Sequence, residues 1–303
     1  MRQLIVLSAL LRMIGTCPAD DEILHFQVEP GQVFHYEANS HKQTEVEVPD
    51  LPAKTTQDLA ERVRFDLTVL ERTPERVRFR KSLGAERMSG TSNGLLVDYD
   101  SERGDPLAGS KDSPAYMVSR MIGQSFEIRV SMEHRVVEIL ECDKLIGMAL
   151  DGLPADHPAR QSIRPEALMV TLADQFLSLP HWTIRPLSKW SERRELFSDF
   201  GLHCSLRRQF TFEGISMMAG RLVARVTTDS TPEFKTDQEG FGQVVQTSGH
   251  QRVESSIDAS TGMLVMSRMD ESLELQLASG APTPVRWKKY HYTDSCEVRL
   301  QAR

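Results

Sequence analysis

Apolar and polar residues alternate with a period of two along much of the chain. The pattern is clearest over residues 63–69, 126–132, 222–226 and 273–277, where every second side chain is apolar. A strand with one apolar and one polar face is typical of antiparallel sheets, whereas buried parallel strands read as continuous apolar runs. A further run near the end of the chain, residues 290–300, places these side chains on one face: Tyr290, Tyr292, Cys296, Val298 and Leu300.

Turn-forming residues separate these runs and predict successive hairpins. They occur at residues 72–75, at 92–94, at Glu213-Gly214 and at 258–262. Proline, glycine and short polar side chains favour the backbone conformations of tight turns. The sequence therefore predicts a mostly β protein built from antiparallel hairpins.

Two segments have the spacing of helices instead. Ser113 precedes Pro114, and Gly123 follows an apolar stripe, which predicts a short helix in the first half. A second helix is expected from about Ile163 to Leu179, with apolar residues three and four positions apart and Pro180 at its end.

The order of strands in the two halves is similar, which suggests a loose repeat, although similar hairpins arise by coincidence in many β proteins. A chain of 303 residues also exceeds the usual size of one domain. We therefore expect two related antiparallel curved-sheet or half-barrel lobes at 24–155 and 181–303, joined by a connector helix within 156–180.

The first residues have the order of a signal peptide. A positive end at Arg2 is followed by the apolar run Leu4 to Leu11 and by small residues up to Ala19. We expect removal of residues 1–19 and export to the periplasm or the exterior, the alternatives being a buried N-terminal element or a lipoprotein anchored through Cys17. No other stretch approaches the ~20 apolar residues that a membrane helix needs.

The cysteines add little to this picture. Cys142, Cys204 and Cys296 would lie in an oxidising compartment, where two of them could pair, but three buried free thiols fit the sequence equally well.

The net charge is -7, which argues against nucleic acid as a partner because such binding depends on neutralising phosphates. One basic run, Arg76, Arg78 and Arg80, alternates with Val77 and Phe79. This spacing places the arginines on one strand face, so we expect a solvated face and not a binding patch.

Several short motifs together resemble a family of secreted bacterial proteins that is classified only as a domain of unknown function. They are the segments 31–36, 97–101, 117–139, 185–190 and 257–264, which together extend over nearly the whole chain. The resemblance implies two β-rich lobes, similar in kind to the half-open barrels of bacterial lipoprotein carriers. It implies no activity and no functional residues.

Local signatures of catalysis are absent from the sequence, including nucleophile elbows, zinc-protease helices, P-loops and dinucleotide motifs. The segment Asp98 to Asp105 has acidic residues at alternate positions, but Arg103 stands where a calcium loop needs glycine. The histidines are scattered. We therefore predict a protein that is not an enzyme, with no catalytic residue, no cofactor and no metal.

Three tryptophans form the candidate surface for a ligand or partner: Trp182, Trp190 and Trp287. The alternative is that they pack a helix onto the sheet. The sequence thus favours an extracytoplasmic binding or scaffold protein whose partner is an envelope protein or an apolar molecule. The alternatives are a carrier of an apolar ligand or lipid in the concave face of the sheet, and a hydrolase with a dispersed site.

Overall fold

The fold was analysed in a computed structural model. The structure describes residues 24–47, 55–92, 94–103, 114–155, 160, 165, 168–169, 172, 175–197, 203–234, 237–238, 242–278 and 287–301. The predicted signal peptide, its cleavage site and Cys17 lie outside these residues.

The first half contributes six strands, which are β1 (Val33–Glu47), β2 (Thr55–Arg72), β3 (Arg76–Ser92), β4 (Leu95–Asp100), β5 (Ser125–Ser131) and β6 (Val136–Leu140). The second half contributes β7 (Lys189–Phe197), β8 (His203–Met218), β9 (Arg221–Phe234), β10 (Asp237–Gln238), β11 (Gly242–Asp258), β12 (Leu264–Ala278) and β13 (Trp287–Leu300). The expectation of a mostly antiparallel β protein is confirmed.

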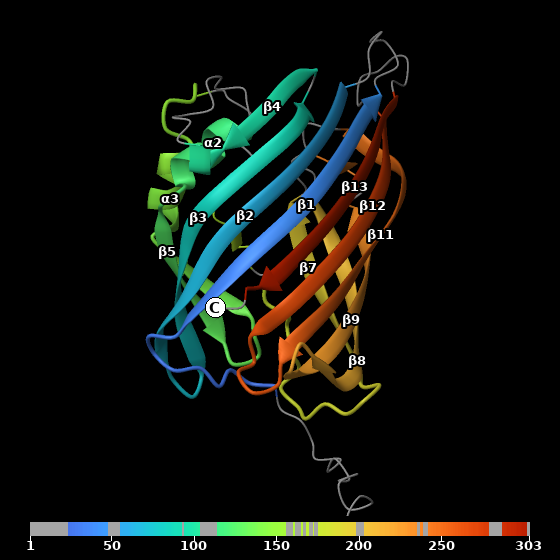
Figure 1. The fold of residues 1–303 in the computed structure, drawn as a ribbon. Helices are drawn as coiled ribbons and strands as arrows, with labels where there is room; N and C mark the ends of the chain where they lie inside the picture. Colours follow the sequence, from blue (N-terminus) through green and yellow to red (C-terminus); the bar gives the residue numbers. More distant parts are fainter. Residues whose placement is uncertain are drawn as a thin grey trace, which may run out of the picture.

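Helices are short and lie to one side of the sheet, beside β3, β4 and β5 (Figure 1). They are the 3-10 turn η1 (Ser101–Arg103), α2 (Pro114–Met121) and α3 (Cys142–Ala149). The α2 helix is the one predicted to begin at Pro114, and Gly123 follows it with a positive φ of 78°. Of the expected connector helix, the described residues from Arg160 to Leu172 are helical, whereas residues 176–180 are not.

All of these strands belong to one sheet, in the order β6-β5-β3-β2-β1-β13-β12-β11-β9-β8-β7, with β4 paired to β3 and β10 to β11. The chain starts in the middle of the sheet, proceeds to one edge, crosses to the other edge and returns to the middle. There β1 pairs antiparallel with β13, from Tyr36 opposite Leu300 to Glu47 opposite Lys289. We call this β1–β13 pairing the seam. It joins the strands of the two halves into one continuous sheet.

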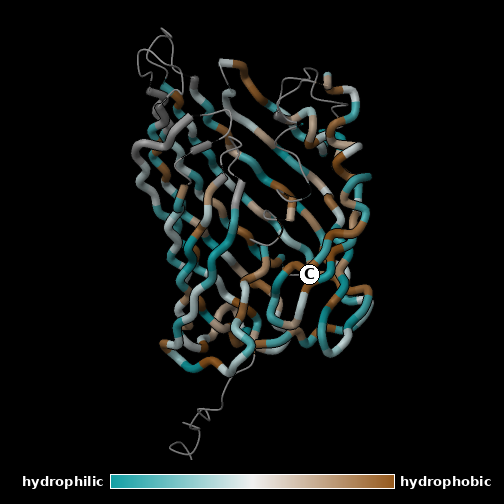
Figure 2. The backbone as a smooth tube through the Cα atoms, turned by 180° about the vertical axis from the view of Figure 1, so that it is seen from behind, coloured by the Kyte–Doolittle hydropathy of each residue, from teal (hydrophilic) through white to brown (hydrophobic). Residues whose placement is uncertain are grey.

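The sheet curls strongly but does not close into a barrel. In Figure 1, β7, β8 and β9 lie behind β11, β12 and β13, so that the sheet has a convex front and a concave interior. Seen from behind, apolar and polar residues alternate along the strands (Figure 2). One face of each strand is thereby placed in the interior.

A short segment, residues 175–179, spans the gap between the two edges of the sheet; we call it the strap. Leu179 donates its backbone N–H to the carbonyl of Glu133 in the β5–β6 hairpin, at 2.8 Å. On the other side, the Trp190 indole of β7 donates to the carbonyl of Ser178 at 3.1 Å. Two adjacent residues of the strap, Ser178 and Leu179, thus connect β7 to the hairpin between β5 and β6.

The main core lies at one end of the interior, beneath the strap. Phe176 of the strap packs against Phe79 of β3 and against Phe26, with ring centroids 5.9 and 6.4 Å apart. Burial of these rings supplies much of the apolar stabilisation at this end. The strap is therefore anchored by aromatic packing as well as by its backbone hydrogen bonds.

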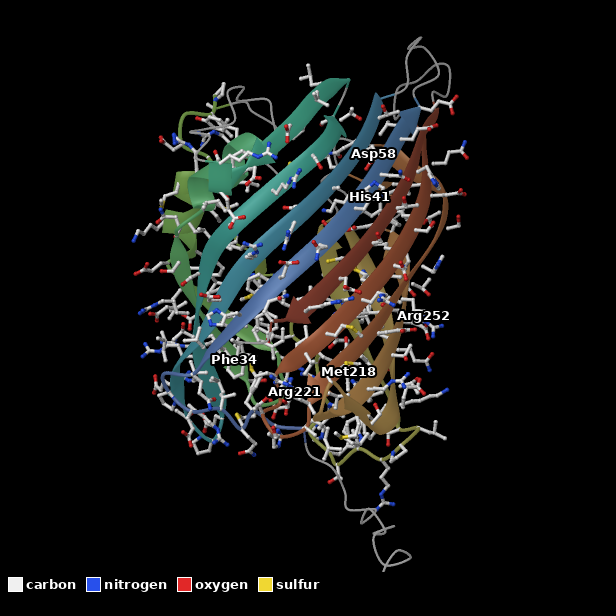
Figure 3. The ribbon with its side chains drawn as sticks, in the orientation of Figure 1. Phe34, His41, Asp58, Met218, Arg221 and Arg252 are labelled. Atoms are coloured by element: carbon white, nitrogen blue, oxygen red, sulfur yellow. The ribbon has the colours of Figure 1, made fainter. Side chains whose placement is uncertain are left out.

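Ion pairs cover the convex face. His41 of β1 and Asp58 of β2 lie side by side in Figure 3, with 2.7 Å between Nε2 and Oδ1. Arg62 pairs with Glu37 at 2.6 Å on the same strands. Both pairs, His41–Asp58 and Arg62–Glu37, are exposed to solvent, so each stabilises the fold only weakly.

Two further findings concern predictions made from the sequence. No disulfide joins the three cysteines that the structure describes, Cys142, Cys204 and Cys296. Within the described chain, no helix has the length and apolar character to cross a membrane.

Candidate functional site

The concave interior contains a cavity of about 390 Å³ beside the strap. Its walls come from β1, β2, β3, β8, β9, β11, β12 and β13, and therefore from both halves of the chain. A volume of this size lies within the range of roughly 300–1,000 Å³ that small-molecule sites occupy.

One end of this cavity is apolar. The side chains that form it converge from the strap and from strands on both sides of the seam, and they are Val63, Phe65, Phe176, Phe210, Leu264 and Val298. Phe210 is held in place by a parallel stack on Trp190, with ring centroids 5.1 Å apart. These rings and branched chains carry no polar atoms, so contact between them and an apolar molecule removes only apolar surface from water.

A row of polar side chains crosses the interior at right angles to the strands; we call it the polar belt. The strand register places each member opposite the next: Lys42, Asp294, Glu271, Gln251, Ser230, Arg208 and Glu192. Residues directly opposite each other in a sheet point to the same face. The belt therefore borders the apolar end of the cavity with charges and amides.

Hydrogen bonds within the belt hold its members in fixed orientations. The Tyr292 hydroxyl donates to Asp294 Oδ2 at 3.0 Å, and Gln251 Nε2 donates to Glu271 Oε2 at 3.4 Å. Arg208 Nη1 lies 3.5 Å from Glu192 Oε1. Because Arg208 is 7% exposed, this pairing partly offsets the cost of burying its charge.

Lys81 is the basic side chain at the apolar end. Its ammonium lies 4.0 Å from the centre of the Phe65 ring and donates to Gln175 Oε1 of the strap at 2.6 Å. Burial lowers the pKa of Lys81 to about 7 because the charged form is poorly solvated there. At neutral pH this lysine is thus charged in only part of the molecules.

Two carboxyl groups meet near the cavity on β2 and β3. Burial, together with the neighbouring Glu61, raises the pKa of Glu86 to about 9, so Glu86 is protonated at neutral pH. Glu61 lines the cavity and accepts a hydrogen bond from Ser40 at 3.4 Å.

Groups that support hydrolysis are positioned elsewhere. Among the described residues that line the cavity there is no histidine, and the pairs His35–Asp66 and His41–Asp58 lie on the convex face. His134 is buried and stacks on Phe26 at 3.9 Å, and burial lowers its pKa to about 3. Among the described residues that line the cavity, the one cysteine is Cys296.

The thiol of Cys296 is a poor nucleophile in this setting. Burial and the neighbouring Asp294 raise its pKa to about 11, which keeps it protonated at neutral pH. Burial likewise raises the pKa of Cys204 to about 12. Both residues act as small apolar side chains at this pH.

Metal ligation has no support in the described part of the chain, where no group of three or more histidine, cysteine, aspartate or glutamate side chains could hold an ion. Asp98 and Asp100, the first two acidic residues of the calcium-like segment, instead face Arg103 at 3.8 and 3.3 Å, and Glu102 pairs with Arg64 at 2.7 Å.

Of the three tryptophans of the predicted surface, neither Trp182 nor Trp190 lines the cavity. Trp182 is 48% exposed beside His181, and Trp190 is buried behind Phe210. Trp287 is the first residue of β13. Four strands lie between β13 and β7, the strand of Trp190. The side chain of Trp287 lies outside the described part of the structure. The proposed surface for a partner thus stays a prediction.

Sequence reasoning missed the polar belt, although a signal for it was present. In the alternating pattern, Asp294 falls on the apolar face of its strand, between Tyr292 and Cys296. Glu271 likewise falls on the face of Leu273, and Arg208 on the face of Phe210. A charged residue on the apolar face of each of three strands predicts either a buried pair or a site. Because the register between these strands could not be known, the three charges could not be placed in one row.

Comparisons with known proteins give a limited result. No protein-family description matches this chain. Nor does any curated protein sequence match it. Among solved structures, a chain of lipovitellin, from a study of lipid–protein interactions in that protein, is similar over 90% of this chain and 25% of its own length, with 9% identity and a TM-score of 0.49.

Proposed function

We propose that this protein is a non-enzymatic, extracytoplasmic binding protein that holds an apolar or lipid-like small molecule in the concave face of its sheet. The observation that carries the proposal is the cavity of about 390 Å³ with one apolar end and a polar belt beside it. An amphipathic molecule matches this division, because its chain and its polar group each meet surroundings of their own kind.

Apolar burial would supply most of the affinity. Each methylene moved from water into such a site contributes about 0.8 kcal/mol, from which the cost of association is subtracted. The affinity is therefore expected to rise about fourfold for each added methylene until the apolar end is filled.

Two alternatives have less support. A scaffold without a ligand would fill the interior of its sheet with its own side chains, whereas this interior retains a cavity. A hydrolase would need a base and a nucleophile in one cleft. The cavity lining offers a protonated thiol and no histidine among the described residues.

The proposal is tested with the neutral apolar fluorophore N-phenyl-1-naphthylamine. Ser267 of β12 lines the cavity, whereas Ser295 of β13 is exposed on the convex face. The substitution Ser267→Phe is expected to weaken binding of the fluorophore at least tenfold by filling the cavity, and Ser295→Phe is expected to leave it unchanged. Failure of the unmodified protein to bind this fluorophore, or equal binding by both variants, would overturn the proposal.

A further inference from the structure

Three buried polar oxygens on one wall of the interior have no hydrogen-bond partner among the described residues. They are Thr228 Oγ1 and Ser230 Oγ of β9 and Gln251 Oε1 of β11. Their residues are 1%, 3% and 6% exposed. A buried polar group without a partner is costly, and most such groups in proteins are satisfied. Three of them on adjacent strands therefore call for an explanation.

The register places the three oxygens on one patch. Ser230 lies opposite Gln251 on one side and opposite Arg208 on the other. Thr228, two residues before Ser230, points to the same face, and both Thr228 and Gln251 line the cavity. The patch thus lies where the polar belt meets the apolar ring of Phe210, which is directly opposite Thr228.

The chemistry of the patch specifies what it can bind. Glu271 accepts the hydrogen bond from Gln251 Nε2, and a carboxylate can only accept, so the amide is oriented with its nitrogen toward Glu271. The remaining amide oxygen needs a donor, whereas each hydroxyl can donate or accept. A ligand group that both donates and accepts, as an alcohol hydroxyl does, satisfies all of these requirements.

The charges around the cavity favour an uncharged ligand. Three basic and three acidic side chains line the cavity, which are Lys42, Lys81, Arg208, Glu61, Glu271 and Asp294. At neutral pH, where Lys81 is charged in only part of the molecules, these side chains carry no net positive charge to balance an anion, and the three unpartnered oxygens are themselves uncharged. Arg208, the charged side chain next to the patch, already lies beside Glu192, so an ionised head group would be buried there with little added compensation, which is costly.

Building on the proposed function, we propose that Thr228, Ser230 and Gln251 form a subsite for the hydroxyl-bearing head of an uncharged single-chain lipid. A long-chain alcohol is the simplest member of this class. Its chain would lie against Phe210 and the other apolar side chains of the cavity. The volume of about 390 Å³ is small for such sites and suits one chain better than two.

The experiment measures displacement of N-phenyl-1-naphthylamine by 1-decanol and by 1-methoxydecane, which keeps the chain and the oxygen but lacks the donor. The unmodified protein is expected to bind decanol about tenfold more tightly than the ether, although the ether is more apolar. Gln251→Leu is expected to remove this preference, and Thr228→Val to weaken decanol binding about tenfold. Both variants should retain the fluorophore, which also reports that they are folded.

Matched controls come from the outer face of β9 and of its neighbour β8. Gln209→Leu on β8 and Thr227→Val on β9 change the same residue types on the convex face and should bind decanol as the unmodified protein does. Decanoate that binds more tightly than decanol, a methyl ether that binds as tightly as decanol, or unchanged decanol binding by Gln251→Leu would overturn this inference while the proposed function stood. Failure of every ligand and of the fluorophore would instead refute the proposed function itself.

Discussion

At the scale of single residues, burial shifts the pKa values of two ionisable side chains on β3, Lys81 and Glu86. In both cases burial favours the uncharged form. Lys81 is 5% exposed and Glu86 is 6% exposed. Each shift links the stability of the fold to pH, but with opposite signs. These residues therefore offer independent tests of how the interior is packed.

For Lys81, the ordinary pKa is about 10.4, whereas the pKa in the folded protein is about 7. Between these pH values the unfolded chain binds more protons, so this residue makes the free energy of unfolding rise with pH, by up to about 1.4 kcal/mol per unit. Lys81→Met is expected to stabilise the protein by roughly 2 kcal/mol at pH 6, after allowing for the lost bond to Gln175. The gain should shrink toward pH 10 in urea titrations, and the exposed Lys144→Met should show no such trend.

For Glu86, the ordinary pKa is about 4.3, whereas the pKa in the folded protein is about 9. Above pH 4.3 the unfolded chain loses this proton and the folded chain keeps it, so the stability that Glu86 contributes is lost as the pH rises to about 9. Glu86→Gln should match the unmodified protein near pH 4 and exceed it by roughly 2 kcal/mol at pH 8. The same titration of Glu254→Gln, an exposed carboxyl, serves as the control, and a Glu86→Gln variant less stable at pH 8 would refute burial of a protonated acid.

At the scale of elements, alternation in the sequence was enough to assign most strand faces. Val77 and Phe79 are fully buried, whereas Arg76 and Arg80 are exposed, as their spacing predicts. Turn signals located most hairpins as well. The exception is Gly214, where a turn was predicted but β8 continues to Met218 through a bulge. Glycine within a strand commonly marks such a bulge, and a short motif cannot distinguish the two.

Another glycine shows a requirement that only the structure reveals. Gly90 has a φ of +138°, and a Cβ there would lie 2.0 Å from the carbonyl oxygen of Asp58 on β2. Gly94 also has a positive φ, of +77°, but a Cβ there would meet nothing within 4 Å. Gly90→Ala should therefore destabilise the protein by about 3 kcal/mol or more, and Gly94→Ala by only about 1 kcal/mol. Equal losses in urea titrations would contradict the close approach of β2 and β3.

At the scale of the whole molecule, the important contact is the seam between β1 and β13. These strands lie at opposite ends of the described chain, and sequence periodicity contains no information about which strands pair. The cavity depends on this pairing because Ser40 and Cys296, which line it, are opposite each other across the seam. The apolar faces could thus be predicted, whereas the cavity that they enclose and the polar belt could not.

The seam also predicts how the molecule unfolds. Trp182, Trp190 and Trp287 all belong to the second half, so tryptophan fluorescence reports on that half, whereas far-ultraviolet circular dichroism reports on every strand. Because one sheet passes through both halves, the two signals should change at the same urea concentration within error. Fluorescence that changes well before or after the dichroism would show that the halves unfold separately.

The central claim, that the concave interior holds an apolar molecule, is tested most directly by native mass spectrometry of residues 20–303 purified from an exporting bacterial host. We predict a reproducible additional mass that is lost on denaturation, is recovered in organic solvent and corresponds to an uncharged single-chain lipid. The same preparation of Ser267→Phe should lack it. A bare chain mass for the unmodified protein, unchanged after incubation with decanol, would contradict the account.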